Sequence, residues 1–85
     1  MTKLEKILNE RPKVHGDFAV GAKFTQGAMR LLEDTPNWED MPDDQREALH
    51  MILHKIQRIA AGDNSHADHW DDLAGYATII SRSLK

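Results

Sequence analysis

The sequence predicts an all-α protein, a small antiparallel helical bundle of four helices of which the first is short. Apolar residues recur at spacings of three and four in four separate segments. No segment shows the period of two that a half-buried strand needs, and no Asn-Gly hairpin occurs. Short loops separate the segments, which is typical of antiparallel neighbours. The chain has 85 residues, and residues 1–85 are expected to form a single domain.

The first expected helix is short because its apolar stripe covers only Lys3 to Asn9. Pro12 is expected to limit it, since the residue before a proline is driven out of the α region. The segment Arg11 to Gly16 is therefore predicted to be a loop. A second helix is predicted from Asp17, a good N-cap residue, to about Glu33.

Two further helices follow an acidic loop, Asp34 to Asp40, in which Trp38 is expected to fold back as an apolar plug. The third helix is predicted to start with Pro42 at its first position and to stop at Gly62. The fourth is predicted to open at Asn64 or Ser65, where Ser65 and Asp68 approximate a capping box, and to run to about Ser83.

Size and composition limit the possible functions. A domain this small buries only about 60% of its unfolded surface, so completion of the bundle by homo-oligomerisation, most simply as a homodimer, is expected. The net charge of −3 and the acids clustered between Glu33 and Glu47 disfavour nucleic acid as a partner. No apolar run is long enough to span a membrane, and no secretory signal is evident, so a cytoplasmic location is expected.

A divalent-cation site is the first chemical hypothesis. Asp68 and Asp72 share one face of the fourth helix, where two carboxylates repel each other unless a cation compensates them. Glu47 is the acid available on the polar ridge of the third helix. Because the chain has no cysteine, Mg²⁺ or Mn²⁺ is the expected ion, with Lys55 and Arg58 placed to hold the phosphates of a nucleotide.

Two alternatives remain open at this stage. Lys55 or Arg58 could instead pair with Asp68 and Asp72 in a purely structural ion-pair network between two helices. His50 and His54, four residues apart, have the spacing of paired helical metal ligands, and His66 and His69 flank Asp68. No third ligand for either histidine pair is evident from the sequence, and no P-loop or dinucleotide-binding motif is present.

Two blocks of the chain resemble an uncharacterised family of small phage and prophage proteins. They are ERPKVHGDF from Glu10 to Phe18, and a Lys-x-x-Arg helix followed by DHWDDLAGYA from Asp68 to Ala77. The resemblance carries over the following positions: Glu10, Arg11, His15, Gly16, Lys55, Arg58, Asp68, Trp70, Asp72, Gly75 and Tyr76. The family is in turn distantly similar to the all-α, MazG-like nucleotide pyrophosphohydrolases, although Glu47-x-x-His50 replaces their usual Glu-x-x-Glu.

The resemblance implies a nucleotide-binding protein with Arg11, Lys55 and Arg58 on phosphates and Glu47, Asp68 and Asp72 on Mg²⁺ or Mn²⁺. Whether such a chain hydrolyses a nucleoside triphosphate to monophosphate and pyrophosphate stays open. If it is phage-encoded, it would act in the host cytoplasm. A function of a different class is also expected: a non-enzymatic accessory protein that binds and modulates a host protein through its acidic Glu33–Glu47 surface.

Overall fold

The computed structural model describes residues 2–85, and this range is all-α, with four helices and no strand. The helices are α1 (Lys3–His15), α2 (Phe18–Glu33), α3 (Asp43–Ala61) and α4 (Ala67–Ser83). At 13 residues, α1 is the shortest of the four. The predicted fold class is therefore confirmed.

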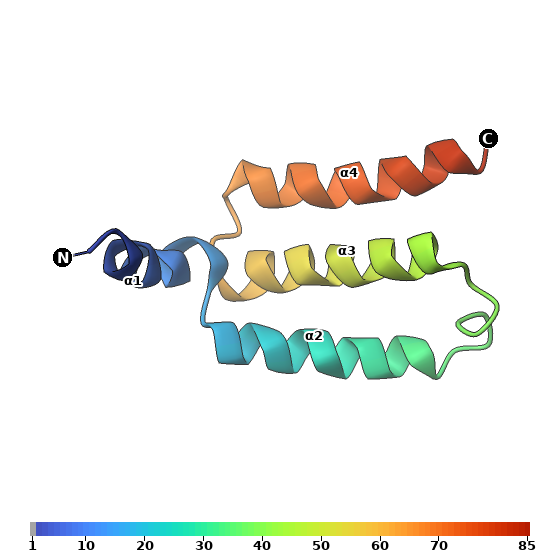
Figure 1. The fold of residues 1–85 in the computed structure, drawn as a ribbon, viewed down its shortest axis with the longest axis horizontal. Helices are drawn as coiled ribbons and strands as arrows, with labels where there is room; N and C mark the ends of the chain where they lie inside the picture. Colours follow the sequence, from blue (N-terminus) through green and yellow to red (C-terminus); the bar gives the residue numbers. More distant parts are fainter. Residues whose placement is uncertain (1) are drawn as a thin grey trace.

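Helix α3 is the centre of the molecule. Figure 1 shows α2, α3 and α4 side by side in one layer, with α2 and α4 both antiparallel to α3. Helix α1 lies at the end of the layer where α3 finishes and α4 begins, and it packs against α3. Every residue of α3 from 48 to 59 is at least partly buried, because neighbours cover the helix on two sides.

A single layer of helices leaves two faces uncovered. Among residues 2–85, Ala48 is the one hydrophobic residue that counts as buried. Many large apolar side chains are more than half exposed, including Leu31 at 76%, Leu84 at 69% and Ile79 at 64%. The described part of the chain thus has an unusually small core for its hydrophobic content.

Helix α1 continues through Pro12 to His15, so the predicted end near Asn9 and the loop from Arg11 to Gly16 are wrong. Pro12 removes one backbone donor, but its own carbonyl still accepts a bond from Gly16 N at 3.0 Å. The last turn is also held by tertiary bonds: the Val14 carbonyl accepts from Asp63 N at 2.9 Å and lies 3.0 Å from His69 Nε2. These hydrogen bonds keep the last turn of α1 helical although the residue before Pro12 disfavours the helical conformation.

Two glycines allow this approach of α1 to the end of α3. Gly16 has a φ of +82°, in the left-handed region that favours glycine. A Cβ on Gly62 would lie 2.7 Å from both Arg58 O and Gly16 N, closer than atoms can approach. We call this backbone-to-backbone meeting the Gly16–Gly62 contact; it fixes the position of the C-terminal half of α1.

The other helix boundaries differ little from those predicted. Asp17 caps α2 by accepting from Val20 N, as expected, whereas Pro42 is the N-cap of α3 rather than its first residue. Helix α4 begins at Ala67, because Asp63 Oδ1 accepts from Ser65 N at 2.8 Å and holds that stretch in a turn.

Trp38 is half-buried in the loop between α2 and α3. The Arg46 guanidinium lies 5.2 Å from the Trp38 ring centroid and donates to the carbonyl oxygens of Trp38 and Glu39. The ring is thus partly covered by the Arg46 cation, and its expected role as an apolar plug stays a prediction.

Candidate functional site

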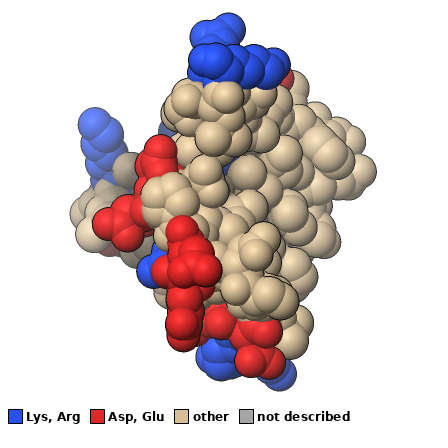
Figure 2. Space-filling model, turned by 90° about the vertical axis from the view of Figure 1, so that its right-hand side faces the viewer, with Lys and Arg blue, Asp and Glu red and all other residues tan. Residues whose placement is uncertain are grey.

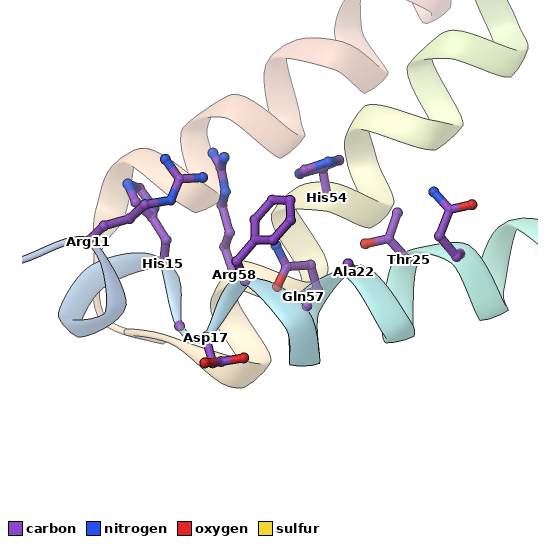
Figure 3. Close-up of a pocket in the computed structure, with 12 residues that line it drawn as sticks. Arg11, His15, Asp17, Ala22, Thr25, His54, Gln57 and Arg58 are labelled. Atoms are coloured by element: carbon purple, nitrogen blue, oxygen red, sulfur yellow. The ribbon is translucent and has the colours of Figure 1, made fainter. Parts of the chain in front are cut away.

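A pocket of about 120 Å³ opens where the end of α1, the first half of α2 and the C-terminal half of α3 meet. Figure 3 shows the residues that line it. They come from three helices and the turn between α1 and α2: Arg11, His15, Gly16, Asp17, Phe18, Gly21, Ala22, Thr25, Gln26, His54, Gln57 and Arg58.

Two basic pairs are placed by helical spacing. Arg11 and His15 lie four residues apart on one face of α1, and His54 and Arg58 do the same on α3. Figure 3 shows Arg11, His15 and Arg58 grouped together, with the Asp17 carboxylate pointing away from them. Asp17 is occupied in capping α2. The pocket therefore gathers cationic groups without a carboxylate directed at them.

The directions of the pKa shifts of the pocket residues agree with this grouping of basic side chains. Burial and the positive charge of Arg11 lower the pKa of Arg58, while Asp72 and Tyr76 act in the opposite direction. Burial, then Arg58 and Arg11, lower the pKa of His15 below 6.5.

Burial, then Arg58, also lower the pKa of His54 below 6.5. Both imidazoles therefore favour the neutral form more than a free histidine does, because each is partly buried beside guanidinium groups that disfavour a further positive charge.

The floor of the pocket contains buried polar atoms without partners. Thr25 is 3% exposed and Gln57 is 8% exposed, and neither Thr25 Oγ1 nor Gln57 Oε1 makes a hydrogen bond. Arg58 Nε and His15 Nδ1 are likewise buried and unpaired. A buried polar group left unpaired costs about 1–3 kcal/mol, so four in one place mark a site at which a ligand could supply the missing bonds.

Glycine again makes room for one of these groups. A Cβ on Gly21 would collide with the Gln57 amide, so the absence of a side chain at this position lets Gln57 lie between α2 and α3. Thr25 is four residues from Gly21 and faces the same way. The close packing of α2 on α3 therefore places both buried polar side chains at the pocket.

Lys55 does not line the pocket. Its Nζ lies 3.0 Å from Asp72 Oδ2, and Lys55 is 7% exposed between α3 and α4. The hydrogen bond and charge of Lys55 hold the pKa of Asp72 below its usual range, with smaller contributions from His69 and Arg58. For this pair of residues, the structure shows the ion-pair alternative.

The three acids predicted to hold Mg²⁺ or Mn²⁺ do not converge. Glu47 Oε1 lies 3.6 Å from His50 Nδ1, and Asp68 Oδ2 lies 3.7 Å from His66 Nε2. Glu47 is eight residues before Lys55, about 12 Å along α3, whereas Asp72 contacts Lys55. Within residues 2–85, no group of three or more histidine or acidic side chains is placed to hold a metal ion.

The histidines form two sets of ring contacts. The His50 and His54 rings are 5.6 Å apart in an edge-on arrangement on α3. The His69 ring lies 5.1 Å from that of His15 and 4.7 Å from that of His66, and His69 is 2% exposed. Because Nε2 of His69 faces a carbonyl oxygen, this ring serves to attach α1 to α4.

Two of the three predicted phosphate ligands, Arg11 and Arg58, thus line the same pocket. The third, Lys55, forms an ion pair with Asp72 instead. Thr25 and Gln57 were not recognised from the sequence. One signal could have identified Thr25: it follows Gly21 by four residues on the small-residue face of a helix, where a close neighbour is expected.

Searches with the chain against protein-family models, curated proteins and solved structures found no match. None of the helices in residues 2–85 combines the length and apolar content needed to cross a membrane.

Proposed function

We propose that this protein binds a phosphate-bearing ligand, with the phosphate held between Arg11 and Arg58. One observation carries the proposal: the guanidinium groups of Arg11 and Arg58 line the same pocket, and no carboxylate within residues 2–85 forms an ion pair with either. Like charges brought together in a partly buried pocket are unfavourable, and a bound anion removes that cost. Arginine also matches the geometry of phosphate oxygens.

The dimensions of the pocket indicate which part of a ligand enters it. A volume of about 120 Å³ is well below the ~300 Å³ at which drug-sized ligand pockets begin. The pocket therefore accepts an anionic head group. Phe18, on the lining and 73% exposed, offers a ring face to the remainder of the ligand.

A nucleotide fits both features, because its terminal phosphate is the anionic head and its base can lie on an aromatic ring. The resemblance to phage proteins of MazG-like character supports the same class of ligand. The proposal is confined to binding, since no group of three or more histidine or acidic side chains within residues 2–85 is placed to hold a metal ion.

Isothermal titration with pyrophosphate and with ATP, each with and without Mg²⁺, tests the proposal. Replacing Arg58 or Arg11 by glutamine removes charged hydrogen bonds worth about 1.5–3 kcal/mol, so affinity should fall by roughly 10- to 150-fold. The matched control is Arg30→Gln, an exposed arginine at the far end of α2, which should bind normally. Equal affinities for all three variants, or no binding by the wild type, contradict the proposal.

The same samples test for catalysis. Release of pyrophosphate from a nucleoside triphosphate in Mg²⁺ or Mn²⁺ that is abolished by Asp68→Ala would extend the proposal to a pyrophosphohydrolase. Binding without release leaves the protein as a nucleotide-binding module.

A second function, binding of a basic host protein, is favoured by the acidic surface between Glu33 and Glu47. All seven acids in this stretch are exposed, and Figure 2 shows acidic side chains gathered on one side of this end of the molecule. Arg46, the one base among them, is directed to two carbonyl oxygens and the Trp38 ring. Capture of a partner from host lysate that weakens in Asp40→Asn/Asp43→Asn/Asp44→Asn supports this function, and unchanged capture contradicts it.

A further inference from the structure

Helix α3 separates two openings of different character. Arg58, in the basic pocket, is nine residues from Leu49, which is about two and a half turns of helix and places the two on opposite sides of α3. On the side of Leu49 lies a groove of about 280 Å³ between α3 and α4, lined by Met41, Gln45, Ala48, Leu49, Ile52, Ala77, Ile80 and Leu84. The groove has no charged residue.

The groove is the middle of a wider apolar face made of one stripe from each helix of the layer. On α3 the stripe is Leu49, Leu53 and Ile56, spaced i, i+4, i+7. On α4 it is Trp70, Ala77 and Leu84, each seven residues from the next.

The stripe on α2 is Val20, Phe24 and Leu31, each roughly half a turn from the pocket residue Ala22. Phe24 is 45% exposed, Val20 58% and Leu31 76%. We call the three stripes together the apolar face.

Charged side chains avoid this face. Charged residues (Asp, Glu, Lys and Arg) make up 29% of the chain. None of them lies between the first and last residue of a stripe at a position that points in the same direction as that stripe. Figure 2 shows the result end-on: acidic side chains lie towards one side, and uncharged atoms cover most of the other, from α4 above to α2 below. A contiguous uncharged surface of this extent marks an interaction site.

We propose that a second copy of the chain covers the apolar face, so that two three-helix layers pack face to face. The chain cannot bury its apolar residues alone, since Ala48 is the one hydrophobic residue that is buried within residues 2–85. Another copy is the partner that is always present at an equal concentration. In a twofold interface the same surface meets itself, which is unfavourable for a charged face but not for an uncharged one.

The area of the apolar face is close to the area that each partner contributes to a stable protein–protein interface. The helices of the layer are roughly 25 Å long at about 1.5 Å per residue, and the layer is 26 Å wide. Their product, about 650 Å² before side-chain relief is included, approaches the ~800 Å² that each partner contributes to a standard stable interface. The basic pocket lies on the opposite face and stays open in such a dimer, so this inference does not depend on the proposed function.

Analytical ultracentrifugation from 1 to 100 μM tests the inference. The wild type should sediment at twice the 9.7 kDa of one chain. Leu31→Glu and Leu84→Glu, at positions 76% and 69% exposed in the single chain, should reduce the mass to one chain or lower helix content, measured by circular dichroism. Ile79→Glu is the matched control: it is 64% exposed but points about 160° away from Ala77, so this variant should stay dimeric.

Each outcome bears on the inference. Loss of helix in Leu31→Glu supports it, because a charge at so exposed a position cannot unfold an isolated monomer. A wild type that is a well-folded monomer throughout, or a trimer or larger assembly, overturns it. A dimer that survives both Leu31→Glu and Leu84→Glu but is lost in Ile79→Glu also overturns it, since a different face would then be the interface.

Discussion

The Gly62→Ala substitution should both destabilise the fold and impair the basic pocket. The new Cβ would be 2.7 Å from Arg58 O and from Gly16 N, and closer still to Val14 O. All three atoms belong to backbone, so no side-chain rotation can relieve the collision. The end of α1 must move away from α3, and it carries Arg11 and His15 out of the pocket.

The expected loss can be estimated from the bonds at this contact. The Val14 carbonyl accepts from Asp63 N and lies within hydrogen-bond distance of His69 Nε2. At about 0.5–1.5 kcal/mol each, the two bonds account for roughly 2 kcal/mol. In a domain of this size, each kcal/mol changes the melting temperature by about 4–8 °C, so a fall of roughly 8–16 °C is expected.

Thermal denaturation followed by circular dichroism measures this effect, and Gly75→Ala provides the control. A Cβ on Gly75 meets no atom within 4 Å, so alanine there should raise the free energy of unfolding by about 0.5–1 kcal/mol through helix propensity. A melting temperature of Gly62→Ala within roughly 2–3 °C of the wild type would contradict the expected destabilisation. A lower melting temperature with unchanged affinity for pyrophosphate would contradict the expected effect on the basic pocket.

Four further predictions follow from the site. Sulfate, whose charge is constant over this range, should bind more tightly as the pH falls from 7.5 to 5.5, because a bound anion favours protonation of His15 and His54, whose pKa values are lowered in the free protein; pH-independent titrations would contradict this. Without ligand, those two imidazoles should make the protein less stable to urea as the pH falls below 6.5, since the unfolded chain then binds protons first; an unchanged midpoint would count against it. Lys55→Met should preserve stability, whereas Asp72→Asn should lower the melting temperature by leaving a buried ammonium unpaired, and the reverse order would exclude a structural role for the pair. Thr25→Val should raise stability by about 1 kcal/mol while weakening pyrophosphate binding, and the hydroxyl plays no part in the site if binding is unchanged.

The helices could be predicted because their signals are local. Apolar spacing located all four, and Asp17 gave the start of α2 correctly. Local signals failed where distant residues decide the structure. Pro12 predicts an early end to α1, but the carbonyl of Val14 finds partners from residues 63 and 69, and these bonds keep the last turn helical.

In the candidate site, too, local spacing could be predicted from the sequence, whereas contacts between different helices could not. Helical spacing predicted that Lys55 or Arg58 could pair with Asp68 and Asp72, and the structure pairs Lys55 with Asp72. Spacing alone could not distinguish this ion pair from two ligands of a metal or phosphate. Arg11 joins Arg58 only because α1 extends far enough to reach the end of α3. Gln57 is placed by the missing side chain of Gly21 on another helix, a pairing that the sequence of one element alone does not reveal.

We propose that an anion binds between Arg11 and Arg58, and a two-dimensional amide NMR titration of the wild-type protein with pyrophosphate tests this binding directly. We expect saturable shifts concentrated at the pocket, at Gly16, Gly21 and Thr25 among others, and their loss in Arg58→Gln. Shifts that do not saturate, or that lie along α4 and the Glu33–Glu47 surface while the pocket amides stay fixed, would show that the anion does not bind between Arg11 and Arg58.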